Sequence, residues 1–141
     1  MKNQPVNIRQ TYMLRLIKDE KVHDTIINFC IQEKIYSGTF SAIGAIKNVE
    51  LGYYDLEKRA YFWKQYPHDV EVVSLMGNIT LVNEVPFLHI HTTISDTENS
   101  TYGGHLNSAE VAVTLEVRLD AFVGVLHREL DECVGLKLIA L

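Results

Sequence analysis

Three of the six histidines in the chain lie close together, in the segment FLHIHTTISDTENSTYGGHLN, residues 87–107. Two of them, His89 and His91, are separated by a single residue within an alternating run that is typical of a β-strand. Alternate side chains of a strand point to the same face, so both imidazoles face the same way. At that spacing both rings can reach one cation at the usual Zn–N distance of roughly 2.0–2.1 Å.

The third histidine, His105, follows the pair Gly103-Gly104. These glycines allow the chain to turn sharply or to approach another backbone closely, and we predict that they form a loop that supports the site. The polar segment DTENSTYGG favours a turn, after which a strand starting near Ala109 runs back antiparallel beside the first two histidines. This arrangement predicts a three-histidine site for a divalent metal, with Zn²⁺ the best match for imidazole ligands. The alternative is a polar cluster in which the histidines hydrogen-bond to one another, to water or to nearby carboxylates.

Other catalytic motifs are absent: the sequence has no GxSxG, Walker-type glycine loop, GxGxxG or HExxH. Glu116, on the polar face of its predicted strand, is the best carboxylate candidate to lie behind a metal ligand. It is equally suited to a structural ion pair with Arg118 or Arg15. The sequence therefore predicts metal ligands but identifies no catalytic base. The remaining histidines, predicted to lie at the surface, are His23, His68 and His127.

Composition is that of an ordinary globular domain. The chain has 141 residues, of which 47% are hydrophobic and 22% charged. No apolar run approaches the ~18 residues that span a bilayer, and the N-terminus MKNQPVNIRQ has no signal-peptide core. The two cysteines, Cys30 and Cys133, are predicted to be reduced thiols. We therefore expect a cytoplasmic protein with no membrane contact.

Charge is distributed unevenly along the chain, whose net charge is −5. Residues 1–70 carry ten basic and eight acidic groups, whereas residues 71–141 carry three basic and ten acidic groups. Proteins that grip duplex DNA unaided concentrate Lys and Arg on one surface. The sequence shows no such concentration, which argues for weak or indirect DNA binding.

The elements that must position the histidines are one helix and many strands. An apolar stripe at helical spacing predicts a helix over about residues 20–36, ended by Gly38. We interpret residues 1–10 as a short polar N-terminal segment and residues 11–141 as a single domain. One helix among strands with short connections is typical of an α+β domain built on a largely antiparallel sheet. The predicted strands cover residues 11–18, 39–55 with a bend near Gly44, 59–66, 69–82, 85–96, 109–120 and 134–141.

Several motifs along the chain resemble the plant and prokaryote conserved (PPC) domain family. They are SAIGAIKNVELGYYD, VSLMGNITLVNEVPFLHIHTTISD and GGHLNSAEVAVTLEV, and the resemblance extends from about Tyr12 to Leu141. It implies an α+β fold with a strongly bent antiparallel sheet and assembly as a homotrimer. Plant members carry an AT-hook, an Arg-Gly-Arg-Pro type core that contacts DNA, ahead of this domain. The ten residues before the first predicted strand contain only Lys2 and Arg9 as basic residues and no such core.

The sequence thus leaves three classes of function open. The resemblance implies a DNA-associated or regulatory module that acts as a trimer through protein partners. The three histidines favour a metal-dependent enzyme or small-ligand-binding protein of unidentified substrate. The third class is a purely structural assembly domain. Fold-level analogy alone does not decide among them.

Overall fold

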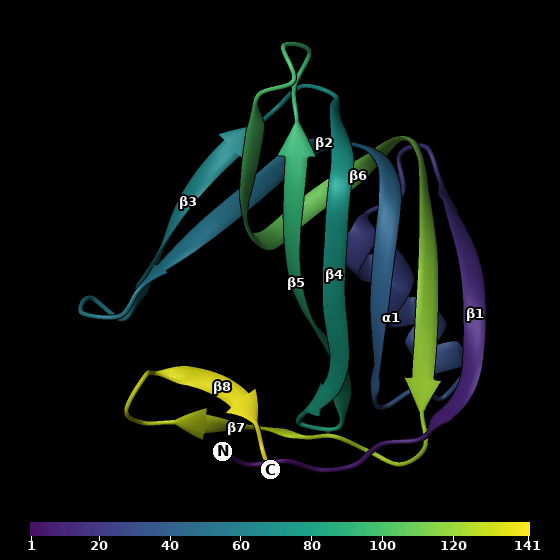
Figure 1. Cartoon of the computed structure of the whole chain (residues 1–141), viewed down its shortest axis with the longest axis vertical. Helices are drawn as coiled ribbons and strands as arrows, with labels where there is room; N and C mark the ends of the chain where they lie inside the picture. The colour runs from purple at the N-terminus through teal and green to yellow at the C-terminus, as the bar shows by residue number, and fades with distance from the viewer.

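The computed structural model describes all 141 residues and consists mainly of β-strands with one α-helix (Figure 1). The pairings between strands are all antiparallel, so the predicted α+β class is confirmed. The elements in chain order are β1 (Ile8–Ile17), α1 (Val22–Gln32), β2 (Gly38–Asp55), β3 (Ala60–Tyr66), β4 (Val70–Val82), β5 (Val85–Ser95), β6 (Thr101–Phe122), β7 (Arg128–Asp131) and β8 (Leu136–Ile139).

The main sheet is strongly bent because two long strands each pair with three neighbours. Its order is β1-β6-β5-β4-β2-β3, and β6 also pairs with β2. The strands β2, β4, β5 and β6 therefore close a cycle of pairings that a flat sheet cannot form. In Figure 1 the β2–β3 hairpin projects to one side, and the separate β7–β8 hairpin lies across the same end of the molecule as both termini.

The predicted bend in β2 lies at Gly44. Its φ of 144° is a conformation that side-chain-bearing residues rarely adopt, and the register with β4 shifts between Ala42 and Gly44. A Cβ atom at Gly44 would lie 2.1 Å from the carbonyl oxygen of Thr114 in β6. Glycine is therefore required here both for the backbone conformation and for the close crossing of β2 over β6.

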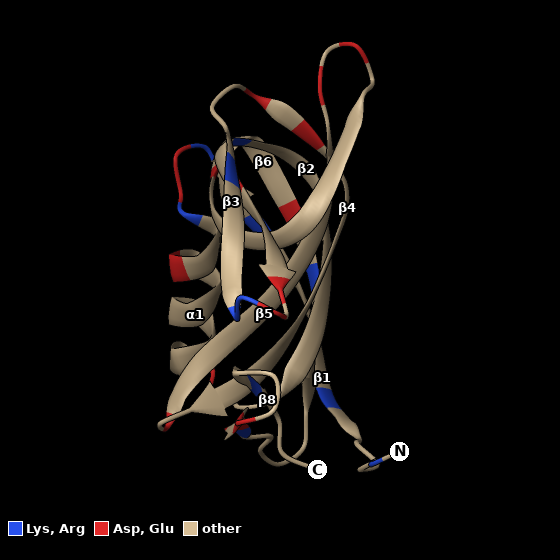
Figure 2. Ribbon diagram, turned by 90° about the vertical axis from the view of Figure 1, so that its left-hand side faces the viewer, with Lys and Arg blue, Asp and Glu red and all other residues tan.

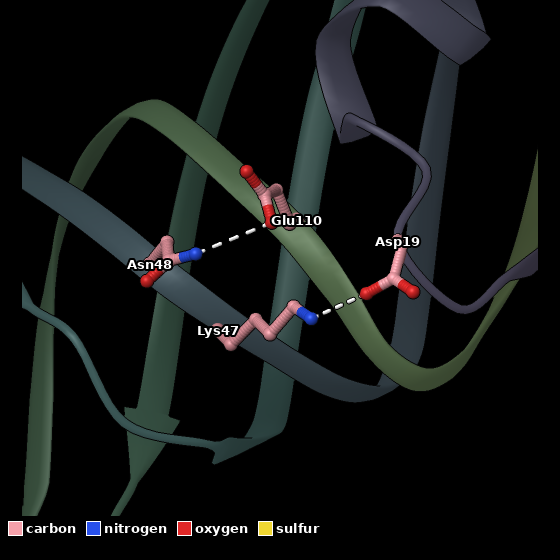
Figure 3. Close-up of polar contacts among 4 residues, drawn as sticks. All are labelled: Asp19, Lys47, Asn48 and Glu110. Carbon is pink, nitrogen blue, oxygen red and sulfur yellow. Dashed lines mark hydrogen bonds and ion pairs between the residues drawn. The ribbon is translucent and has the colours of Figure 1, made fainter.

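A group of polar contacts marks the next irregularity of the β2–β6 pairing, where the register shifts after Lys47. Lys47 forms an ion pair with Asp19, in the turn between β1 and α1 (Figure 3). Asn48 donates a hydrogen bond from Nδ2 to Oε2 of Glu110 in β6, at 3.2 Å (Figure 3). Because the pair with Asp19 is exposed, we assign these contacts to local geometry rather than to overall stability.

Helix α1 packs against β5 and β6 and fills one side of the bent sheet. Its buried residues Val22, Ile26 and Cys30 follow the predicted apolar stripe. With 11 residues it is far too short to cross a membrane, and the chain has no other helix. Both cysteines are unpaired; Cys30 is buried, which raises the pKa of its thiol to about 12, whereas Cys133 is exposed.

The helix is shorter than the predicted range of about 20–36. It ends at Gln32 because Lys34 adopts a left-handed conformation with φ of 54°, and the N–H of Ile35 donates to the carbonyl oxygen of Cys30 at 2.8 Å. This is the hydrogen bond of a Schellman-type helix end, here formed without glycine. Gly38, the predicted terminator, instead begins β2.

Candidate metal centre

The histidine site lies where β5 and β6 pair. His91 in β5 stands directly opposite His105 in β6, and His89 lies two residues earlier on β5. The strand alternates as the sequence predicts, because the intervening Leu88 and Ile90 are buried in the core. The structure therefore brings all three predicted histidines together on the face of the sheet that points away from the core.

The three imidazoles are close enough to share one cation. Nε2 of His89 lies 3.2 Å from Nε2 of His91, and one nitrogen from each of the three rings lies within 4.8 Å of the others. Two ligands of a tetrahedral zinc ion with Zn–N distances of 2.0–2.1 Å are roughly 3.3–3.4 Å apart. The first pair is close to that separation, whereas the ring nitrogen of His105 is only placed within 4.8 Å of the other two.

Electrostatics keep two of the rings neutral near pH 7. Burial, followed by the neighbouring imidazoles of His89 and His91, lowers the pKa of His105 to about 4. Burial and then the guanidinium of Arg128 lower the pKa of His89. Metal ligation requires neutral imidazole, so this environment favours the ligand form over the imidazolium.

The donor set is suited to a cation, and His89 and His91 also lie within hydrogen-bonding distance of each other. Nδ1 of His105 is buried and has no hydrogen-bond partner. No carboxylate forms a hydrogen bond or ion pair with any of the three rings. A buried ring nitrogen left without a partner costs free energy, and ligation of a cation is one way to satisfy such a nitrogen. If zinc binds, His89, His91 and His105 are the residues that hold it.

Aromatic residues of β3 cover one side of the site. The ring of Tyr61 lies 5.1 Å from that of His105 and stacks on Trp63 at 4.5 Å between ring centroids. Trp63 in turn lies over Gly52 of β2, where a Cβ atom would be 2.3 Å from the indole ring. The bend of β2 thus carries the β3 aromatics around toward β6. Tyr61 and Trp63 therefore lie beside the histidine site, with ring centroids 5.1 Å and 6.2 Å from that of His105.

A cationic residue from the C-terminal hairpin borders the other side. Nη2 of Arg128 lies 3.4 Å from Nδ1 of His89. The guanidinium also donates hydrogen bonds to Thr80 and Asn78 of β4. Burial lowers the pKa of Arg128, because desolvation disfavours the charged form. Arg128 is a site residue that the sequence analysis did not identify. The sequence offered one signal for it, because Arg128 is one of only three basic residues in the acidic second half of the chain, residues 71–141.

The role of the double glycine differs from the predicted supporting loop. Gly103 and Gly104 lie inside β6, which begins at Thr101 rather than near Ala109, and neither has a positive φ. A Cβ atom at Gly104 would lie 2.8 Å from the carbonyl oxygen of Gly52. Of the two roles considered, close backbone approach applies here and a sharp turn does not.

The other predicted residues lie outside the histidine cluster. Glu116 is exposed on β6, opposite Arg15 and Ile43, and has no hydrogen bond or ion pair with a histidine or with Arg118. His68 and His127 are exposed, as predicted. His23 is not a surface residue: it is half-buried against β6, its Nδ1 has no partner, and burial lowers its pKa.

A family model and one of the similar solved structures name the same family. The family model of the Plants and Prokaryotes Conserved (PCC) domain matches residues 3–123. A metal-containing protein from Archaeoglobus fulgidus has 35% sequence identity and a TM-score of 0.94, with 99% of each chain covered. A plant- and prokaryote-conserved (PPC) protein from Pyrococcus horikoshii has 31% identity and a TM-score of 0.93, over 99% of this chain and 97% of that one. A protein from Bacteroides thetaiotaomicron named a "putative dna binding protein" has 25% identity and a TM-score of 0.89, over 96% of each chain. No curated protein sequence matches the chain.

Proposed function

Because the chain belongs to the Plants and Prokaryotes Conserved (PCC) domain family, also abbreviated PPC, we propose that it is a metal-binding member whose histidine site presents a divalent cation to a small ligand. The observation that carries this proposal is the convergence of His89, His91 and His105 on one point of the sheet. The metal-containing Archaeoglobus fulgidus protein, which is similar over 99% of the chain, supports it.

Zinc is the proposed cation, because three neutral imidazoles suit it best among the available divalent metals. Three protein ligands leave a fourth coordination position for water or for a ligand atom, which is the pattern of catalytic rather than structural zinc sites. The site also adjoins two hollows, of about 460 Å³ and about 340 Å³, each lined by His89 and one of the other two histidines. We identify no catalytic base beside the site, so the proposal is ligand binding, with metal-dependent catalysis as its extension.

The test is metal analysis of the purified protein and of single-histidine variants after zinc supplementation. His91 is exposed, so His91→Ala should remove most of the zinc while leaving the far-UV circular dichroism unchanged. His68→Ala, which removes an exposed histidine outside the cluster, is the matched control and should retain the wild-type zinc content. Zinc content should also fall in acid, because protons compete for imidazole, and the lowered pKa values of His89 and His105 place that loss below the ordinary histidine value of ~6.5. Stoichiometric zinc in His91→Ala would contradict the proposal.

A second candidate is a DNA-associated regulatory module, favoured by the Bacteroides thetaiotaomicron relative's name. The charge distribution argues for an indirect role. Figure 2 shows the basic residues dispersed over several strands and loops rather than gathered on one element. With a net charge of −5, we expect duplex DNA to bind with a Kd no tighter than about 10⁻⁶ M at physiological salt. Tight, sequence-selective retardation in a gel-shift assay without added partners would make direct DNA recognition the better assignment.

We also propose that the protein assembles as a homotrimer, as the family resemblance implies. The outer face of the sheet is rich in exposed apolar residues, including Met13 (71% exposed), Ile43 (61%) and Met76 (66%). Met76 stands directly opposite His91, so this apolar face is continuous with the histidine site. Exposed apolar patches of this kind mark interaction surfaces. Light scattering that reports a monomer at micromolar concentration would refute this assembly.

A further inference from the structure

Arg128 is a half-buried cation without a counter-ion. Its guanidinium donates from Nε to Oγ1 of Thr80 at 3.0 Å, from Nη2 to Oδ1 of Asn78 at 2.8 Å and from Nη1 to the carbonyl oxygen of Lys137 at 2.7 Å. These acceptors are neutral, and no carboxylate lies within ion-pair distance of Arg128. Charged groups removed from water are normally paired, so the side chain is held in place but its charge is uncompensated.

Arg128 lines a hollow that is also lined by two of the histidines. The hollow has a volume of about 340 Å³, and its polar wall consists of His89, His105, Arg128 and Lys137. That volume lies at the lower end of the range of small-ligand sites. Its apolar wall comes from Tyr61, Phe87 and the leucines of the β7–β8 hairpin. The side chain of Phe87 lies against the guanidinium, whose carbon is 5.4 Å from the ring centroid.

We propose that this hollow binds a small organic carboxylate with a short apolar chain, whose carboxylate is recognised by Arg128 beside the cation held by the histidines. The inference rests on the proposed function, since it names the class of ligand for that same site. It further assigns a role to the C-terminal hairpin, which lies beyond the residues matched by the family model and supplies both Arg128 and part of the apolar wall.

Charge balance favours an anion over a neutral ligand. Three neutral imidazoles leave the full charge of a divalent cation, and Arg128 adds a further positive charge at its border. The guanidinium can donate to a carboxylate, and one of its four Nη hydrogens is not used by the contacts to Lys137, Asn78 and His89. The exposed Phe87 and Leu130 would be covered by the apolar chain, which inorganic anions lack.

The experiment uses the full-length protein loaded with Co²⁺, whose visible spectrum reports changes at the metal. Butyrate is the probe, with 1-butanol as its neutral counterpart and inorganic phosphate as an anion without an apolar chain. Butyrate should change the cobalt spectrum saturably, and 1-butanol should not. Arg128→Gln should weaken butyrate binding at least about tenfold, the effect of a charged hydrogen bond. Arg15→Gln, which removes an equal charge from an exposed position of β1 outside both hollows, should leave butyrate affinity unchanged.

Each outcome bears on the inference. Equal butyrate affinity in wild type and Arg128→Gln, or equally tight Arg128-dependent binding of phosphate, would overturn the carboxylate assignment. If Arg128→Gln does not fold, Arg128→Lys keeps the charge but loses the planar fork, and should bind butyrate more weakly than wild type at unchanged cobalt content. Cobalt content is measured separately from butyrate binding. A protein that holds no metal would refute the proposed metal-binding function but would leave carboxylate recognition by Arg128 to be tested. Arg128 is then tested by NMR shifts that butyrate induces around it in the metal-free protein; their absence would overturn the inference.

Discussion

The close approach at Gly104 yields the sharpest prediction for the stability of the site. Gly104 precedes His105 on β6, and its backbone lies against the carbonyl oxygen of Gly52 on β2. In Gly104→Ala the new Cβ atom would be 2.8 Å from that oxygen, where ordinary contacts are 3.4–4 Å. Neither partner is a flexible side-chain end, so β2 and β6 must move apart beside the histidine site.

The expected change in the free energy of unfolding of Gly104→Ala is the sum of two opposing effects. Forcing an extra carbon into a close-packed position costs about 1–3 kcal/mol. Replacing glycine by alanine also restricts the unfolded chain, which stabilises the fold by about 0.4–1 kcal/mol. The net expectation for Gly104→Ala is a loss of about 1–2 kcal/mol. At Gly103 the nearest atom is the carbonyl oxygen of Thr92 at 3.2 Å, so Gly103→Ala should remain within about 1 kcal/mol of wild type.

The two variants, Gly104→Ala and Gly103→Ala, add the same methyl group at adjacent positions of one strand. Urea unfolding of both proteins without metal, in EDTA, therefore measures the effect of the close approach at Gly104 alone. For a domain of this size Gly104→Ala should lower the Tm by about 2–8 °C. Zinc titration should show weaker binding in Gly104→Ala than in Gly103→Ala, since the first variant displaces the backbone next to His105. If Gly104→Ala proved as stable as wild type, or less harmful than Gly103→Ala, close backbone approach would not be the reason for this glycine.

Two further predictions concern the core and the effect of pH. Ile90 lies between the two histidines of β5 but points into the core with no exposed area, so Ile90→Ala should cost about 2–5 kcal/mol in urea unfolding, whereas the exposed His91→Ala should cost far less. The pKa values of His23, His89 and His105 are lowered in the folded state, so the unfolded chain binds more protons below its ordinary histidine pKa of ~6.5. The metal-free protein should therefore lose stability as the pH falls from ~6.5, with the contribution of His105 lost by about pH 4. His105→Gln should flatten this dependence in urea midpoints measured at several pH values, and an unchanged slope would contradict the assignment.

The strand pattern was predictable because burial alternates with residue number. In β5 the sequence separated the core residues from the histidines correctly, since Leu88 and Ile90 are buried while His89 and His91 face outward. The bend in β2 was also predictable, because Gly44 interrupts an otherwise regular apolar pattern. Local preferences of this kind depend on a few neighbouring residues and can be read from the sequence.

Features that depend on contacts between distant residues were not predictable. The helix ends at a left-handed Lys34, which has no strong sequence signal, so glycine at position 38 was the more obvious terminator. The segment that leads to His105 resembles a turn in composition but forms the start of β6, because β5 and β2 both offer pairing partners there. Arg128 reaches the site through the fold of the C-terminal hairpin, which no local pattern indicates.

The geometry of the histidine site is a consequence of the bent sheet rather than of the histidines alone. At His105, β6 pairs with His91 of β5 on one side and with Gly52 of β2 on the other. Beyond this point β6 leaves β5 and continues along β2, so the two strands that carry the ligands adjoin each other only over residues 91–95 and 101–105. The relative position of His91 and His105 is therefore controlled by how closely β2 approaches β6, and the absence of a side chain at Gly104 permits that approach. A side chain at Gly104 should alter metal affinity without altering any ligand, which distinguishes a site built by the sheet from a chance grouping of surface histidines.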